Sequence, residues 1–180
     1  MKTPTIETER IVIRPLKISD AKAIYNHWAK DPDVLKYLRW NAHQSIDVTI
    51  EWLKYEEQSG IEDDNSYQWA FEGKESHEVF GSGSLSYNKE RRMFEISYAL
   101  MKKQWGKGLA TEAVKAIVHF AINELNQTEL FATYAKDNFA SGRVLEKTGF
   151  VCRNHGKYAS FDGERIFESK EMFFTTDTAV

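Results

Sequence analysis

Hydrophobic and polar positions alternate most regularly over residues 94–100, where an apolar side chain takes every second place. This period of two predicts a β-strand. A short polar segment follows, and from residue 109 to residue 122 the apolar side chains recur at three- and four-residue spacing. That spacing predicts a helix with a broad apolar surface. The chain is therefore expected to pass from a strand, through a turn, directly into a buried helix.

Two glycines, Gly106 and Gly108, lie in the turn between this strand and this helix. Glycine lets backbone N–H groups approach a ligand, and the first turn of a helix leaves amides unpaired beneath a partial positive charge. The turn therefore predicts an anion-binding site. A nucleotide-triphosphate loop ends in Gly-Lys-Ser/Thr, whereas this turn reads Gly-Leu-Ala-Thr. A dinucleotide-binding turn is disfavoured because Thr111 stands in place of the third glycine.

The remaining pattern predicts strands and helices that alternate only in the middle of the chain. Strands are expected at residues 10–16, 66–72, 79–87, 129–135, 150–158 and 165–175, and helices at 19–30, 34–40, 45–57 and 138–147. Ser19 is the expected N-cap of the first helix, and Gly60 the expected end of the third. Gly81 and Gly83 predict a bulge or a close backbone approach. The fold class is α+β, with a mostly antiparallel central sheet and helices on both faces.

Composition narrows the function classes further. The chain has 180 residues and no linker or repeat, so a single domain over residues 1–180 is expected. The net charge of -3 and the lack of a basic run argue against nucleic-acid binding. No long apolar span or leader is present, so we expect a cytoplasmic protein without a membrane segment. Cys152 is alone and expected to be buried, and the scattered histidines predict no metal site.

Three blocks of sequence resemble one family in the same order along the chain. The run from Trp105 to Ala113, WGKGLATEA, resembles the acyl-CoA pyrophosphate loop of the GNAT superfamily of N-acetyltransferases, and more narrowly its RimJ/RimL-like branch. The superfamily pattern is Gln/Arg-x-x-Gly-x-Gly/Ala, from which only Trp105 departs. Residues 135–150 resemble the N-x-x-S-x-x-V-L-E-K-x-G-F signature of the branch, and residues 8–16, TERIVIRPL, resemble its beginning.

The resemblance implies the acetyltransferase fold, whose fourth and fifth strands splay apart, and acetyl-CoA as co-substrate. Its pantetheine arm would lie along the backbone of Tyr98, Ala99 and Leu100 like an added strand. Its diphosphate would accept hydrogen bonds from the amides of the turn, which are those of Gly106, Lys107, Gly108, Leu109, Ala110 and Thr111. The Lys107 side chain either adds positive charge there or lies free in solvent. Asn138 matches the asparagine that binds pantetheine, and it also suits a helix N-cap.

Acetyl transfer needs a neutral amine and a proton for the leaving thiolate. Glu95 is the candidate base, because a catalytic glutamate occupies this place in several acetyltransferases; the alternative is an exposed strand glutamate. Ser141 is the candidate acid, since Leu145 replaces the tyrosine used by many relatives; the alternative is a simple first-turn serine. Tyr37 and Trp40 either line the acceptor mouth or belong to the core.

The resemblance points to an enzyme that moves acetyl from acetyl-CoA to a primary amine by direct transfer in a ternary complex. The expected acceptor is the N-terminus of a protein, with ribosomal proteins as the precedent in the branch. The alternatives are a polyamine or aminoglycoside acceptor, and a non-catalytic acyl-CoA-binding sensor. The acidic run over residues 56–64 is either a solvated loop or an attractor for a cationic substrate. Dimers are common among relatives, so a homodimer is possible.

Overall fold

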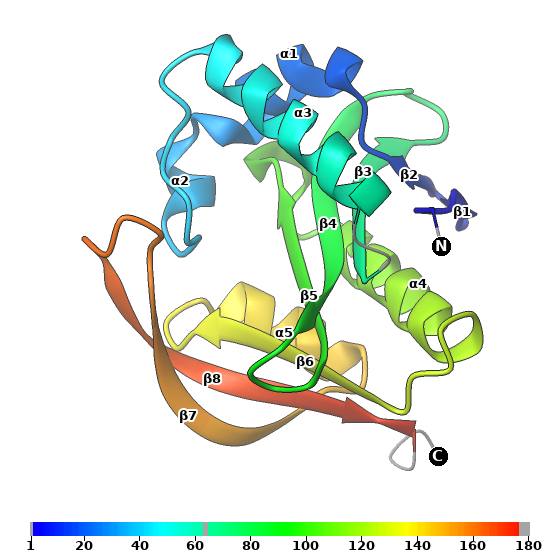
Figure 1. The fold of residues 1–180 in the computed structure, drawn as a ribbon, viewed down its shortest axis with the longest axis vertical. Helices are drawn as coiled ribbons and strands as arrows, with labels where there is room; N and C mark the ends of the chain where they lie inside the picture. The colour runs from blue at the N-terminus through cyan, green and yellow to red at the C-terminus, as the bar shows by residue number, and fades with distance from the viewer. Residues whose placement is uncertain (1, 63–64, 177–180) are drawn as a thin grey trace.

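The computed structural model describes residues 2–62 and 65–176. Within them, eight strands form one sheet in the order β1-β2-β3-β4-β5-β6-β8-β7 (Figure 1). Neighbouring strands are antiparallel except β5 and β6, which are parallel. The strands are β1 Ile6–Glu7, β2 Ile11–Pro15, β3 Ser66–Gly73, β4 Val79–Asn88, β5 Met93–Leu100, β6 Glu129–Ala135, β7 Val151–Ala159 and β8 Ile166–Thr175. The predicted mostly antiparallel sheet is confirmed.

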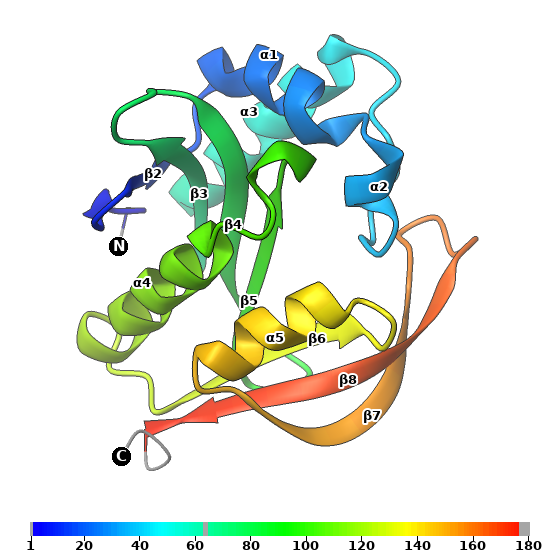
Figure 2. The ribbon, with the colours of Figure 1, turned by 180° about the vertical axis from the view of Figure 1, so that it is seen from behind.

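The sheet opens between β5 and β6. These strands pair only at Phe94 with Leu130 and at Glu95 with Phe131. Beyond that point β5 stays paired with β4, whereas β6 follows β8. Figures 1 and 2 show the two strands meeting near one end of β5 and then diverging. The splayed strands that the family resemblance implied are therefore present.

Helices cover both faces of the sheet (Figure 2). α4 packs on the face that carries the aromatic side chains of β3. There the Phe120 ring lies edge-on to Tyr67 and Trp69, at centroid distances of 5.2 and 5.6 Å. The opposite face is covered by α1 and α3, and α5 contacts β6. The helices are α1 Ala21–Ile24, α2 Pro32–Leu35, α3 Ile46–Glu62, α4 Leu109–Asn123 and α5 Phe139–Lys147.

Several element boundaries differ from prediction. The first helix starts as a 3-10 turn, η1 Ile18–Asp20, and ends as a π-helix, η2 Tyr25–Ala29. Its N-cap is Lys17 rather than Ser19. The helix expected at 34–40 lies earlier, as α2. The Asp31 carboxylate caps α2 by accepting from the Asp33 amide at 2.9 Å, with proline in its first turn.

Three further predictions were wrong or incomplete. α3 runs through Gly60 to Glu62, because one glycine costs a helix only about 1 kcal/mol. Of the acidic run, residues 56–62 belong to α3 rather than to the expected loop, and residues 63–64 lie outside the described chain. Strand β1 was not predicted, being two residues long. Cys152 is exposed rather than buried, since it lies in β7 at the edge of the sheet.

The two glycines of β4 do mark a close approach. A Cβ at Gly81 would lie 2.7 Å from the Ala99 carbonyl oxygen, and a Cβ at Gly83 would lie 2.4 Å from the Phe71 ring. Real Cβ atoms do not approach other atoms so closely, so neither position has room for a side chain. The register of β3 against β4 also shifts beside Phe71, which is the predicted irregularity.

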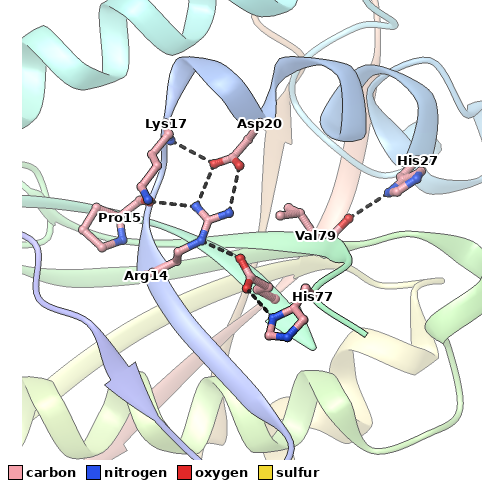
Figure 3. A network of polar contacts seen from close by, with 8 residues as sticks. Arg14, Pro15, Lys17, Asp20, His27, His77 and Val79 are labelled. Atoms are coloured by element: carbon pink, nitrogen blue, oxygen red, sulfur yellow. Dashed lines mark hydrogen bonds and ion pairs between the residues drawn. The ribbon is translucent and has the colours of Figure 1, made fainter. Parts of the chain in front are cut away.

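A buried ion-pair network joins β2 to the first helical turn (Figure 3). The Arg14 guanidinium donates to both Asp20 oxygens at 2.8 and 2.9 Å, and to Glu72 of β3 at 2.7 Å. The hydrogen bond to Asp20 raises the pKa of Arg14 above its ordinary value, although burial opposes this. Asp20 also accepts from the Lys17 amide at 2.9 Å. Asp20 therefore satisfies the start of the helix, which explains why Ser19 is not its cap.

Candidate active site

A cavity of about 90 Å³ lies in the gap between β5 and β6. Its lining residues are Tyr37, Leu38, Ile96, Ser97, Tyr98, Ala132, Thr133, Tyr134, Ala135, Asn138, Ser141, Leu145 and Tyr158. Hydroxyl, amide and apolar groups are present, but no carboxylate, ammonium, guanidinium or imidazole belongs to this lining. The cavity therefore brings together four of the predicted site residues, from β5, α5 and the α2 region: Tyr37, Tyr98, Asn138 and Ser141.

Ser141 is held from two sides in this cavity. Its amide donates to the Asn138 side-chain oxygen at 3.2 Å, so Asn138 caps α5 while also lining the cavity. Its hydroxyl oxygen lies 2.9 Å from the Tyr98 hydroxyl, which also donates to the Ser141 carbonyl at 3.2 Å. Burial raises the pKa of Tyr98, while the hydrogen bond to Ser141 acts against it. Tyr98 therefore stays neutral and orients Ser141.

The turn before α4 keeps its amides available. Gly106 and Gly108 adopt φ values of 75° and 78°, a left-handed conformation that favours glycine. The first amide of α4 that donates to a described residue is that of Glu112, to the Gly108 carbonyl at 3.0 Å. Among the described residues, none accepts a hydrogen bond from the amides of residues 106–111. This is the arrangement expected of a diphosphate cradle.

Trp105, the residue that differs from the superfamily pattern, holds this turn in place. Its indole N–H donates to the Leu100 carbonyl at 2.9 Å, which ties the turn to the end of β5. The Leu100 carbonyl, placed by prediction on the cofactor edge, is therefore occupied by a side chain of the protein. The Lys107 ammonium donates to the Gln104 side chain at 2.9 Å and is exposed. An exposed position in the turn fits either interpretation of Lys107.

A clamp from the N-terminal segment holds the first turn of α4. The Glu112 carboxylate accepts from the Thr8 hydroxyl at 2.6 Å, the Arg10 amide at 2.9 Å and the Arg10 Nε at 2.7 Å. Arg10 also donates to the Lys107 carbonyl at 3.0 Å. Burial favours a higher pKa for Glu112, but these hydrogen bonds and the Arg10 charge outweigh it and lower that pKa. Glu112 therefore stays ionised at neutral pH and fixes the turn.

Glu95 does not line the cavity. It lies at the closed end of the gap, where β5 still pairs with β6, and its carboxylate accepts from the Asn88 side chain at 2.8 Å. Ser97, two residues along on the same strand face, does line the cavity. Proton transfer from an acceptor to Glu95 would therefore run through water.

Of the two residues predicted to bind the acceptor, Tyr37 lines the cavity and Trp40 does not. The Tyr37 ring lines the cavity, and its hydroxyl donates to the Asp137 carbonyl at 3.4 Å. Trp40 packs instead against His43 at a centroid distance of 5.4 Å and is not part of the lining. Tyr134 and Tyr158 also line the cavity. Sequence reasoning missed them, because a tyrosine in a strand is equally typical of a core position.

Among the described residues, no group of three or more histidine, cysteine or carboxylate side chains is placed to hold a metal ion. Among the described helices, none combines the length and the hydropathy of a membrane-spanning segment.

Comparison with known protein families identifies the family of this chain. The family model described as acetyltransferase (GNAT) domain matches residues 10–151. The chain belongs to the GNAT acetyltransferase family. It is an acetyltransferase, and enzymes of this family use acetyl-CoA.

The relatives and structures similar to this acetyltransferase agree. It is 29% identical over 153 residues to the uncharacterized N-acetyltransferase YoaA of Bacillus subtilis, with 82% of each chain covered. The structure of a GNAT-family acetyltransferase from Bacillus anthracis matches with a TM-score of 0.82 at 20% identity, covering 97% of this chain and 99% of that one. The ribosomal-protein-S5-alanine acetyltransferase of Vibrio fischeri matches with a TM-score of 0.78 at 21% identity, covering 97% of each.

A third structure shows how widely the fold is used. The spermidine N-acetyltransferase of Vibrio cholerae, in complex with CoA and spermine, matches with a TM-score of 0.78 at 20% identity, covering 95% of this chain and 98% of that one. At these identities the likeness shows the fold alone and does not identify the amine acceptor of this chain.

Proposed function

We propose that this acetyltransferase acts as a single domain and moves acetyl from acetyl-CoA to the α-amine at a protein N-terminus, by direct transfer in a ternary complex. The amine nitrogen attacks the thioester carbon, so that an N–C bond forms and the C–S bond breaks. The nitrogen loses a proton, and the thiolate of CoA gains one. A cytoplasmic location and a homodimer stay predictions.

The uncharged lining of the cavity carries this proposal. At pH 7, deprotonating an α-amine of pKa ~8 costs about 1.4 kcal/mol, whereas a lysine-like amine of pKa ~10.4 costs about 4.6 kcal/mol. With Glu95 outside the lining, the site offers no direct carboxylate to a charged amine. A weakly basic α-amine needs the least help, so it suits this cavity better than a polyamine.

The rim of the cavity points the same way. The Lys36 ammonium lies 5.1 Å from the centroid of the Tyr37 ring, and the Arg39 guanidinium lies 4.8 Å from that of Tyr158. Both rings line the cavity, and both cations are exposed. These charges repel a polycation such as spermidine, and they tolerate a peptide with one terminal amine.

We assign the roles from the positions of the groups. The amides of residues 106–111 bind the diphosphate, and Asn138 contacts the pantetheine arm. Glu95 accepts the amine proton through water, and Ser141 gives a proton to the thiolate. Ser141 has the Tyr98 hydroxyl at 2.9 Å to hold it in place.

Thiol release from acetyl-CoA tests the function. The assay compares peptides with free N-termini, the same peptides acetylated at the N-terminus, spermine and an aminoglycoside. We expect turnover on the free peptides alone. Turnover on spermine but on no peptide would replace the proposal by a small-amine enzyme, and binding of acetyl-CoA without turnover would favour a sensor.

Glu95→Gln tests the base. Because the amide cannot accept a proton, we expect turnover on a peptide to fall severalfold at pH 7. Turnover should recover as the pH approaches 9, where the α-amine is already neutral. The pH profile of kcat/KM measures this, with wild type as reference. Equal activity of both proteins at every pH would remove Glu95 from the mechanism.

A further inference from the structure

Residues 35–41, which begin at the last residue of α2, take their shape from a distant hairpin. Within this segment the main chain makes one local hydrogen bond, from the Leu38 amide to the Leu35 carbonyl at 3.0 Å. Five of its carbonyls instead accept from the end of β7 and the β7–β8 turn, residues 158–165. The acceptors are the carbonyls of Leu35, Tyr37, Leu38, Arg39 and Trp40. The conformation of residues 35–41 therefore depends on hydrogen bonds from the hairpin.

Arg165 supplies most of these contacts. Its Nη1 donates to the Leu35 carbonyl at 3.1 Å, and its Nη2 donates to the carbonyls of Leu38 and Trp40 at 3.1 Å each. Nη2 also donates to the Asn41 side chain at 2.8 Å. A planar guanidinium can serve several acceptors in one plane, whereas an ammonium presents a single point charge. One side chain thus binds both ends of the segment.

Two further residues of the hairpin complete the contact. The Tyr158 hydroxyl donates to the Tyr37 carbonyl at 2.6 Å, and the Phe161 amide donates to the Arg39 carbonyl at 2.7 Å. Asn41 also donates to the carboxylate of Asp162. The contact therefore covers the whole length of the segment.

This segment forms one wall of the cavity. Tyr37 and Leu38 line it, and the Tyr37 hydroxyl reaches the Asp137 carbonyl next to Asn138. The exposed cations Lys36 and Arg39 flank Tyr37 on the same segment. The diphosphate turn is held separately, by Thr8, Arg10 and Glu112. Distortion of the segment should therefore change one wall of the cavity and leave the turn intact.

We propose that Arg165 is a positioning residue for the amine acceptor: it holds residues 35–41 so that Tyr37 forms the acceptor wall of the cavity. This inference rests on the proposed function, because it assumes an amine acceptor. It adds that acceptor affinity depends on a side chain in the β7–β8 hairpin, which touches neither the amine nor acetyl-CoA.

Arg165→Met and Arg165→Lys test this inference in the full chain. We expect Arg165→Met to raise the KM for the peptide about tenfold or more, since several charge-assisted hydrogen bonds are lost. The Kd for acetyl-CoA, measured by calorimetry, should stay within about twofold, because the diphosphate turn keeps its own support. Arg165→Lys should give a smaller rise in KM. A general folding defect would instead weaken acetyl-CoA binding together with peptide use.

Arg153→Met is the matched control. Arg153 lies in β7, with its guanidinium over Phe173 at 5.3 Å and 3.9 Å from Glu129, away from residues 35–41. We expect it to leave the peptide KM unchanged. The inference is overturned if Arg165→Met raises that KM no more than Arg153→Met does, or if acetyl-CoA affinity falls in step with it. If Arg165→Met does not fold, Tyr158→Phe removes a hydroxyl that is bonded to the Tyr37 carbonyl and to the Ala135 backbone, and it should still raise the KM.

Limited trypsin digestion separates this inference from the proposed function. Lys36 and Arg39 are exposed cleavage sites within the held segment. We expect faster cleavage there in Arg165→Met than in wild type or Arg153→Met. If wild type acetylates no amine, the proposed function fails while digestion still decides whether Arg165 holds the segment. Equal cleavage of all three proteins at these sites would refute that hold.

Discussion

Replacing Gly108 by glutamate is expected to abolish acetyl-CoA binding. Gly108 is the N-cap of α4 at φ 78°, and its amide is one of those that we propose bind the diphosphate. A glutamate there strains the backbone, places its Cβ 3.5 Å from Arg10 Nη2 and adds a negative charge beside the proposed diphosphate site. At ~4 Å and an effective dielectric constant of ~20, one pair of like charges costs about 4 kcal/mol, which weakens binding roughly a thousandfold. Calorimetric titration with acetyl-CoA measures the loss.

Gly163→Glu is the control for backbone strain. Gly163 has φ 76°, and a Cβ there would meet no atom within 4 Å. This variant carries the same strain and charge in the β7–β8 turn, and its Kd for acetyl-CoA should match that of wild type. If Gly108→Glu instead binds acetyl-CoA as wild type does, the glycine turn is not the diphosphate site.

Among the variants proposed for this protein, Arg14→Met is expected to lower the free energy of unfolding most. The side chains of Arg14, Asp20 and Glu72 are 15%, 6% and 19% exposed, so the variant leaves two carboxylates without their cation in a mostly buried place. Removing one partner of a buried ion pair lowers the free energy of unfolding by about 3–5 kcal/mol. For a chain of this size that lowers Tm by roughly 6–20 °C. Urea titration and thermal melts measure both quantities.

Two further variants serve as controls for the loss of stability in Arg14→Met. Arg153→Met removes an arginine whose side chain is 43% exposed, and it should change the free energy of unfolding by no more than about 0.5 kcal/mol. In the double variant Arg14→Met/Asp20→Asn the remaining charge is smaller, so part of the lost stability should return. An unchanged urea midpoint for Arg14→Met would show that the network of Figure 3 does not stabilise the fold.

The strands and the two long helices were predictable because their signals are local. The alternation over residues 94–100 matches β5, and the three- and four-residue spacing after Gly108 matches α4. Two helix starts were predicted wrongly, one because of a distant contact and one because of a local cap. Asp20, held by the distant Arg14, satisfies the start of the first helix in place of Ser19. Asp31 caps α2 locally, so that α2 begins before the predicted residue 34.

The candidate site was predictable only in part. The turn at Gly106 and Gly108 follows from sequence, because glycines before a helix are a local signal for anion binding. The partnership of Tyr98 with Ser141 does not follow, since these hydroxyls lie 43 positions apart in sequence and meet only across the cavity. Nor does the exclusion of Glu95 from the lining, which depends on where β6 leaves β5.

From the order of its residues alone, this chain revealed most of its elements and the turn that should hold a diphosphate, and the resemblance of three sequence blocks pointed to its family. The elements and the turn depend on neighbours within a few positions, where backbone geometry and side-chain period are enough. The cavity wall formed by Tyr37 and Leu38 required the folded chain, because Arg165 reaches back to Leu35 across 130 positions. The same holds for the support of the turn, where Thr8 meets Glu112 across 104 positions. No local pattern encodes such contacts: they form only when the whole sheet brings the segments together.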